Sequence, residues 1–102
     1  MEPDDVVFAV IIRGHGQVSN PPDWTEIARL LSRMQAEFDV AITVNVYNAL
    51  LELCALSNDV ARAEELLDKM ASQGIQPNEQ THMAVDGKRA LRSALRRTFD
   101  NI

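Results

Sequence analysis

The sequence carries one apolar pattern twice, and this internal repetition constrains the fold more than any other feature. Mostly apolar residues recur at i, i+3, i+4 and i+7, which lie on one face of an α-helix. The third stripe repeats the first, with every residue displaced along the chain by the same amount, and the fourth repeats the second in the same way. The pattern therefore predicts two copies of a two-helix unit. The stripes are Phe8, Ile11, Ile12 and His15; Ile27, Leu30, Leu31 and Met34; Tyr47, Leu50, Leu51 and Cys54; and Ala63, Leu66, Leu67 and Met70.

Short polar segments between the stripes predict where the helices begin and end. Asn58 or Asp59 is expected to cap one helix by accepting a backbone N–H bond, and Asn20 or Asp23 to cap another. Gly74 suits the left-handed residue that follows a helix. A single hairpin of two such helices cannot bury its apolar faces, so the hairpins are expected to stack on one another.

Residues 79–102 keep the pattern poorly and predict either a partial repeat or a capping helix. One repeat after the third stripe, the equivalent positions include only one properly apolar residue, Val85. A different register favours one helix, or a helix kinked near Gly87, with Thr81 as its cap. That register consists of Ala84, Leu91, Ala94, Leu95 and Phe99. The outer face of this segment would carry a basic cluster of Lys88, Arg89, Arg92, Arg96 and Arg97.

Composition and charge exclude several classes of function. The 102 residues fit one domain, residues 1–102. The net charge of -5 gives no general attraction to phosphate backbones or anionic membranes. The longest apolar run, residues 6–12, is far shorter than the ~20 residues of a membrane helix, so no membrane insertion is expected. Cys54 and the two histidines lack metal-ligand spacing, and no catalytic constellation is present. We therefore expect no enzyme, no cofactor and no small-molecule substrate.

Residues 44–78 resemble a single pentatricopeptide repeat. The resemblance rests on four features, which are Tyr47-Asn48-Ala49-Leu50-Leu51, Ala63, Leu66-Leu67-Asp68-Lys69-Met70 and the ending Gly74-Ile75-Gln76-Pro77-Asn78. Residues 5–43 resemble a degenerate repeat that keeps Phe8 and Met34 at the equivalent positions. The resemblance implies an all-α fold, a short right-handed α-solenoid of antiparallel helical hairpins with a terminal capping helix.

The family resemblance also implies which residues contact RNA. Helical repeats of this kind read about one base each with two or three side chains. The reading pair would be Asn48 and Asn78, which in this family favours a pyrimidine, cytosine more than uracil. Asn45 and Gln80 stand where the family places the side chains that stack on bases. The basic cluster, from Lys88 to Arg97, would contact phosphates.

Two functions follow from the resemblance as alternatives. The first is a single-stranded RNA-binding module in organellar RNA processing, stability or translation, in a mitochondrion or chloroplast. The second is a protein scaffold or assembly subunit of a large organellar complex. The negative charge, the polar Asn45 and Gln80, and the small number of repeats favour the second. Residues 1–5 are acidic and do not resemble a transit peptide.

Overall fold

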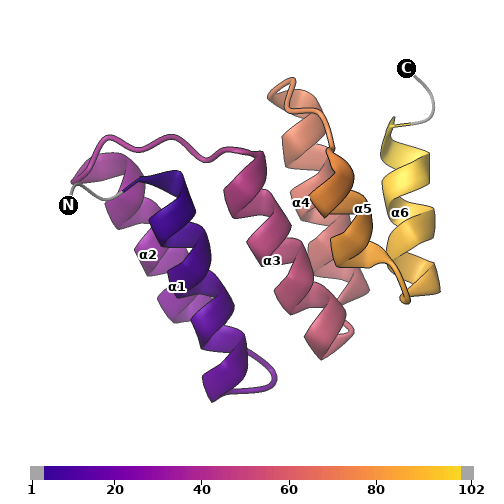
Figure 1. Cartoon of the computed structure of the whole chain (residues 1–102), viewed down its shortest axis with the longest axis horizontal. Coiled ribbons are helices and arrows are strands. Elements are labelled where there is room, and N and C mark those ends of the chain that lie inside the picture. The colour runs from indigo at the N-terminus through magenta and orange to yellow at the C-terminus, as the bar shows by residue number, and fades with distance from the viewer. Residues whose placement is uncertain (1–3, 100–102) are drawn as a thin grey trace.

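The computed structural model describes residues 4–99, which form six helices and no strand (Figure 1). Consecutive helices run antiparallel, so the chain builds three hairpins that stand side by side, and the all-α repeat fold predicted from the sequence is confirmed. Within the described part of the chain, none of the helices has the length and apolar character needed to cross a membrane. The helices are α1 (Asp5–Val18), α2 (Trp24–Ala36), α3 (Val44–Ser57), α4 (Val60–Ser72), α5 (Glu79–Val85) and α6 (Arg89–Phe99).

Helix α3 lies at the centre of the molecule, between α1 and α5, and also packs against α4. Its predicted stripe is buried, because Tyr47, Leu50, Leu51 and Cys54 are each 2% exposed or less. In α4, the stripe residues Ala63, Leu67 and Met70 are also buried, whereas Leu66 is half-buried. The clearest part of the sequence pattern therefore forms the core of the fold.

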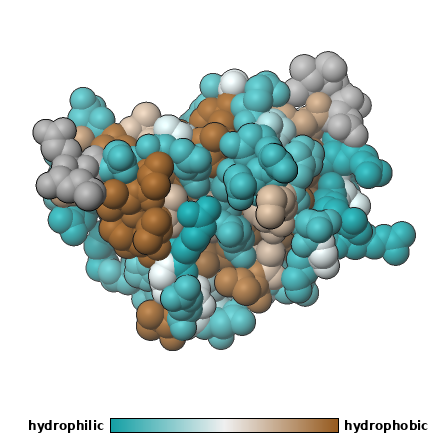
Figure 2. Space-filling view, viewed as in Figure 1, coloured by the Kyte–Doolittle hydropathy of each residue, from teal (hydrophilic) through white to brown (hydrophobic). Residues whose placement is uncertain are grey.

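The stripe of the first helix is only partly buried. Phe8 and Ile12 are in the core, but Ile11 is 43% exposed, so its prediction as a core residue is wrong. Ile11 is the counterpart of Leu50 in the repeated pattern, and Leu50 lies on the helix that α1 covers. Within the described residues no hairpin covers the corresponding face of α1, and Figure 2 shows an apolar patch over this helix. Ala9, two residues before Ile11, is buried instead.

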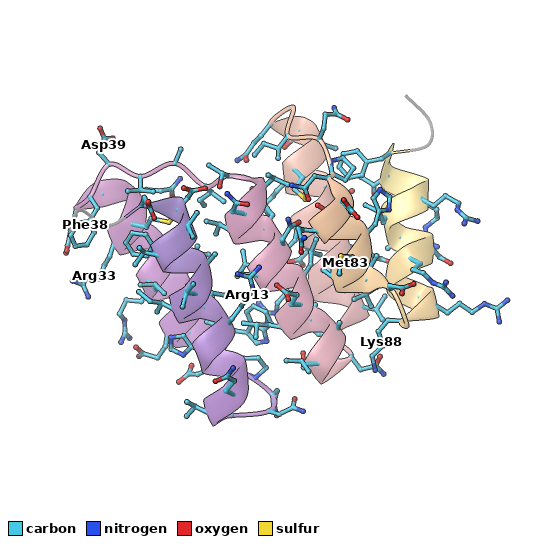
Figure 3. All side chains as sticks on the ribbon, in the orientation of Figure 1. Arg13, Arg33, Phe38, Asp39, Met83 and Lys88 are labelled. Carbon is cyan, nitrogen blue, oxygen red and sulfur yellow. The ribbon has the colours of Figure 1, made fainter. Side chains whose placement is uncertain are left out.

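The packing of α1 on α3 is close and is reinforced by polar contacts. A Cβ atom added to Gly16 would lie 2.3 Å from Cδ2 of Leu53, so an alanine there would force the Leu53 side chain or the helices to move. Arg13 reaches from α1 to α3 and forms an ion pair with Glu52 at 2.7 Å (Figure 3). At the start of α1, Asp5 accepts hydrogen bonds from side chains that precede and begin α3. The two hairpins are thus joined by both shape and charge.

The predicted helix boundaries agree with the structure except in the third hairpin. Asp23 and Asp59 are the N-caps of α2 and α4, and Gly74 has a left-handed φ of 74°. Residues 79–99 form two helices separated by a loop, where the sequence favoured one helix or a helix kinked near Gly87, which has a φ of 85°. Asn78, not Thr81, caps α5. A carboxamide at this position accepts the N–H of the third helical residue, which is Thr81 itself.

The third hairpin repeats the second in shortened form. Helix α5 has 7 residues, whereas α1 and α3 have 14 each. Helix α6 nevertheless packs against α4 as a repeat should. Leu91 and Leu95, which are buried in α6, have the same spacing as Ala63 and Leu67 of α4. The number of residues between the α4 pair and the α6 pair is smaller than one full repeat. Most of the shortening falls in the first helix of the hairpin.

Candidate nucleic-acid interface

The structure brings Asn48 and Asn78, the two residues expected to read a base, into direct contact. The Nδ2 atom of Asn48 donates to Oδ1 of Asn78 at 3.1 Å. The Oγ1 atom of Thr81 donates to Oδ1 of Asn48 at 2.5 Å. Asn48 is only 1% exposed, so its carboxamide lies behind that of Asn78, which is exposed. The two asparagines and Thr81 therefore form one hydrogen-bonded cluster between α3 and the start of α5.

Capping of α5 fixes how the Asn78 side chain is turned. Its Oδ1 atom accepts the backbone N–H of Thr81 at 3.1 Å, while the N–H of Asn78 donates to Oγ1 of Thr81 at 3.0 Å. The carbonyl oxygen is thus committed to α3 and α5. The Nδ2 group of Asn78 forms no hydrogen bond within residues 4–99. This cluster consequently presents a hydrogen-bond donor at its exposed side.

Asn45 and Gln80, the two expected stacking residues, stand in different surroundings. Both are exposed, but Nδ2 of Asn45 donates to Oδ2 of Asp5 at 2.8 Å. The same Asp5 oxygen accepts from Oγ1 of Thr43 at 2.6 Å. These two hydrogen bonds hold the pKa of Asp5 below its usual value, because they stabilise the carboxylate more than burial disfavours it. Asn45 is therefore held against α1, whereas Gln80 lines an open groove.

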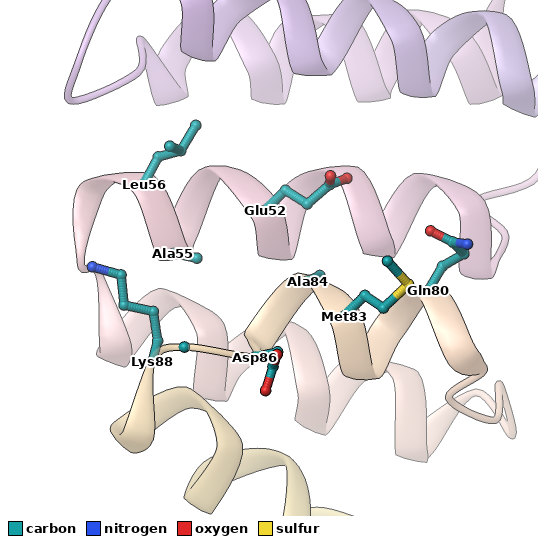
Figure 4. Close-up of a pocket in the computed structure, with 9 residues that line it drawn as sticks. Glu52, Ala55, Leu56, Gln80, Met83, Ala84, Asp86 and Lys88 are labelled. Atoms are coloured by element: carbon teal, nitrogen blue, oxygen red, sulfur yellow. The ribbon is translucent and has the colours of Figure 1, made fainter.

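The groove lies between α3 and α5 and has a volume of about 530 Å³ (Figure 4). Helix α3 contributes the Ala55 side of the groove, and α5 contributes Gln80, Met83 and Ala84. Lys88 closes one end from the loop before α6. Gln80 and Lys88 are thus the two residues of the expected RNA surface that share this groove.

The other members of the basic cluster lie on α6. Arg97 pairs with Glu64 of α4 at 2.9 Å, and Arg92 lies 4.0 Å from Asp86. Arg92 and Arg96 line a second cavity of about 400 Å³ between α5 and α6, and Arg89 is exposed at the start of α6. The predicted phosphate contacts are consequently distributed over two sides of the third hairpin and do not form one patch.

Two residues of this surface were not singled out from the sequence. Thr81 was expected only as a cap, yet its hydroxyl connects the two asparagines. Val6 occupies on α1 the place that Asn45 occupies on α3, and it is 53% exposed. The repeated pattern could have identified Val6, whereas the Thr81 contact depends on the stacking of α5 on α3.

Cys54 adds no reactive thiol to this surface. Burial raises the pKa of the Cys54 thiol to about 12, so it stays protonated near neutral pH. This is consistent with a packing role on α3. No group of three or more His, Cys, Asp and Glu side chains placed to hold a metal ion occurs within residues 4–99.

Comparison with known proteins identifies the repeat. The chain matches the pentatricopeptide repeat domain over residues 29–85, which is more than half of its length. Neither the curated proteins nor the solved structures gave a match. The matched range includes α3, α4 and α5, and therefore the Asn48 and Asn78 cluster. Proteins with these repeats are typically non-enzymatic, RNA-binding and organellar. The chain belongs to the pentatricopeptide repeat family.

Proposed function

We propose that this chain binds single-stranded RNA and that the Asn78 side chain, held from behind by Asn48, reads one pyrimidine. Family membership supports RNA as the ligand. The observation that carries the proposal is the free Nδ2 group of Asn78, whose oxygen is already occupied by Asn48 and Thr81. The cluster therefore holds one donor group in a fixed orientation before any ligand arrives.

The chemistry of a fixed amino group favours cytosine. An amide NH₂ donates two hydrogen bonds and accepts none. Cytosine presents N3 and O2 as adjacent acceptors on its Watson–Crick edge, whereas N3 of uracil carries a proton and donates. The cluster thus supports a preference for cytosine over uracil.

Neighbouring residues supply stacking and phosphate contacts. Val6, Asn45 and Gln80 are exposed, and a base could pack between successive members of this set. Lys88 and Arg89 are exposed near the groove and are available to phosphates. One stacked base contributes about 1 to 3 kcal/mol, and the net charge of -5 adds little attraction. We therefore expect weak binding that is lost at moderate salt.

The experiment uses fluorescence anisotropy with short oligoadenylates that carry one variable central base. Asn78→Asp is the key variant, because aspartate caps a helix as well as asparagine but cannot donate. We expect the native protein to prefer the cytosine oligonucleotide and the variant to lose that preference, with about tenfold weaker binding to it. Asn20→Asp makes the same charge change in the α1–α2 loop and is the matched control. Equal affinity for all four bases, or equal effects of the two variants, would overturn the proposal.

The cellular role we propose is organellar RNA processing, stability or translation, in a mitochondrion or chloroplast. A second candidate, a scaffold subunit of an organellar complex, is favoured by the exposed apolar residues of α1. Val10 is 60% exposed and Ile11 is 43% exposed, a surface that suits a protein neighbour better than RNA. Purification of the tagged protein from organelles, before and after nuclease treatment, separates the two roles. RNA-dependent recovery of partners supports the first role, and nuclease-resistant recovery supports the second.

A further inference from the structure

The groove between α3 and α5 lies beside a helix, α5, that is half as long as α1 and α3. Seven helical residues make about two turns and about 10 Å of helix. Helix α5 ends at Val85, and the chain turns away through Gly87, which has a left-handed φ of 85°. The last turns of α3 therefore lack the cover that a full-length neighbour would provide, and the groove of about 530 Å³ extends from the exposed side of α5 to this part of α3.

The first and second hairpins show what fills the equivalent space when both helices are complete. Gly16 of α1 and Ala55 of α3 occupy equivalent positions, because each directly follows the last residue of its stripe. Over Gly16 lie the side chains of Leu53 and Leu56, close enough that an added Cβ would be 2.3 Å and 3.3 Å from them. Over Ala55 lies the open groove. The missing occupant is thus a helical segment with apolar side chains at i and i+3.

The walls of the groove suit a helix that approaches closely. Ala55 and Ala84 line it with small side chains, and Met83, which is 61% exposed, borders one end (Figure 4). Small residues let two helices come near, and an exposed methionine adapts its shape to an apolar partner. The groove is continuous with the packed contact between α3 and α5, so an occupant would extend an interface that already exists.

The charged residues of the groove determine which charge on an occupant is favoured. Glu52 is paired with Arg13 at 2.7 Å, and Asp86 lies 4.0 Å from Arg92. The Lys88 ammonium forms no ion pair or hydrogen bond with any residue in 4–99. A helix that continued the direction of α5 would bring its C-terminal end, which carries partial negative charge, toward Lys88.

We propose that this groove binds an amphipathic helical segment of a partner protein, about two turns long, that takes the place of the missing half of α5. The segment carries leucine-like side chains at i and i+3 over Ala55 and Ala84, and a carboxylate in its last turn that meets Lys88. The proposal is independent of base reading by Asn78.

The test uses a fluorescent, side-chain-stapled peptide of roughly ten residues, with leucines at i and i+3 and a glutamate in the last turn. Binding is followed by anisotropy with the full chain. We expect saturable binding, a loss of at least fivefold for Lys88→Glu, and recovery with a peptide whose glutamate is replaced by lysine. Arg89→Glu is the matched control, because this neighbouring cation does not line the groove and should leave peptide binding unchanged.

A second variant, Ala55→Phe, fills the groove from a half-exposed position and should abolish binding, while circular dichroism checks its helix content. A peptide with serines in place of both leucines should not bind. Absence of saturable binding up to about 1 mM would overturn the proposal. Equal effects of Lys88→Glu and Arg89→Glu would also overturn it, as would variants that change affinity for single-stranded RNA but not for the peptide.

Discussion

Helices α1 and α3 carry the same sequence pattern at equivalent positions of two successive repeats, yet they are buried to very different extents. Leu50 of α3 is 2% exposed, whereas its equivalent Ile11 in α1 is 43% exposed. Ala49 is fully buried, whereas its equivalent Val10 is 60% exposed. Helix α3 has a neighbour on both sides, and α1 has one on a single side within the described residues. A stripe therefore specifies which face of a helix is apolar, and stacking decides whether that face is buried.

The largest expected difference in the free energy of unfolding is between the variants Leu50→Ala and Ile11→Ala. Truncating the buried leucine removes apolar contacts and leaves a cavity, which costs about 2 to 5 kcal/mol. Truncating the exposed isoleucine should cost less than about 1 kcal/mol. Urea unfolding followed by circular dichroism measures both free energies. Equal losses for the two variants would mean that α1 is covered in solution, for example by self-association.

The next comparison is between Asn48, in the hydrogen-bonded cluster between α3 and α5, and Asn45, which bonds to Asp5 between α3 and α1. Asn48 is buried, so Asn48→Ala should remove its hydrogen bonds with Thr81 and Asn78 and cost about 1 to 3 kcal/mol. Asn45 is exposed, and Asn45→Ala should cost less than about 0.5 kcal/mol. The same unfolding measurement applies. A larger loss at Asn45 would contradict the assignment of the buried cluster to the contact between α3 and α5.

Two glycines in α1 test how closely this helix approaches α3. An alanine at Gly14 meets no atom within 4 Å, so Gly14→Ala should stabilise the helix by up to about 1 kcal/mol. An alanine at Gly16 would collide with the buried side chain of Leu53. Gly16→Ala should therefore destabilise by about 1 to 2 kcal/mol despite its better helix propensity. Thermal melts of the two variants should move in opposite directions, and a shared direction would argue against the close contact.

The smallest expected effect is the change in stability with pH that comes from ionisation of Asp5. In the folded state, hydrogen bonds from Thr43 and Asn45 lower the pKa of Asp5 below its ordinary value of 3.8. The stabilisation is therefore complete above pH 3.8 and is lost as the pH falls through the lower, folded-state pKa. Because this carboxylate is largely accessible to solvent, the effect on stability should be small. An NMR titration of Asp5 should show a midpoint below that of an unhindered aspartate, and Asn45→Ala should raise it.

The sequence predicted most of the fold because the information was local. Stripes such as Tyr47 to Cys54 and caps such as Asp59 depend on residues within one or two turns. The exposure of Ile11 and the groove over Ala55 were not predictable, since they depend on which neighbour is absent or shortened. The Asn48 and Asn78 pair was placed by family resemblance, but its link through Thr81 joins residues 33 positions apart. Such contacts appear only once the hairpins are stacked.

The most direct test of base reading follows the side-chain amide signals of the isotope-labelled protein while single-stranded RNA with one cytosine is added. The Asn78 Nδ2 group is free within the described residues and should shift first and furthest, with a smaller change at Gln80. The buried Asn48 signal should remain slowly exchanging, because its carboxamide stays bonded behind Asn78. An unchanged Asn78 signal, with shifts confined to the arginines of α6, would contradict the account.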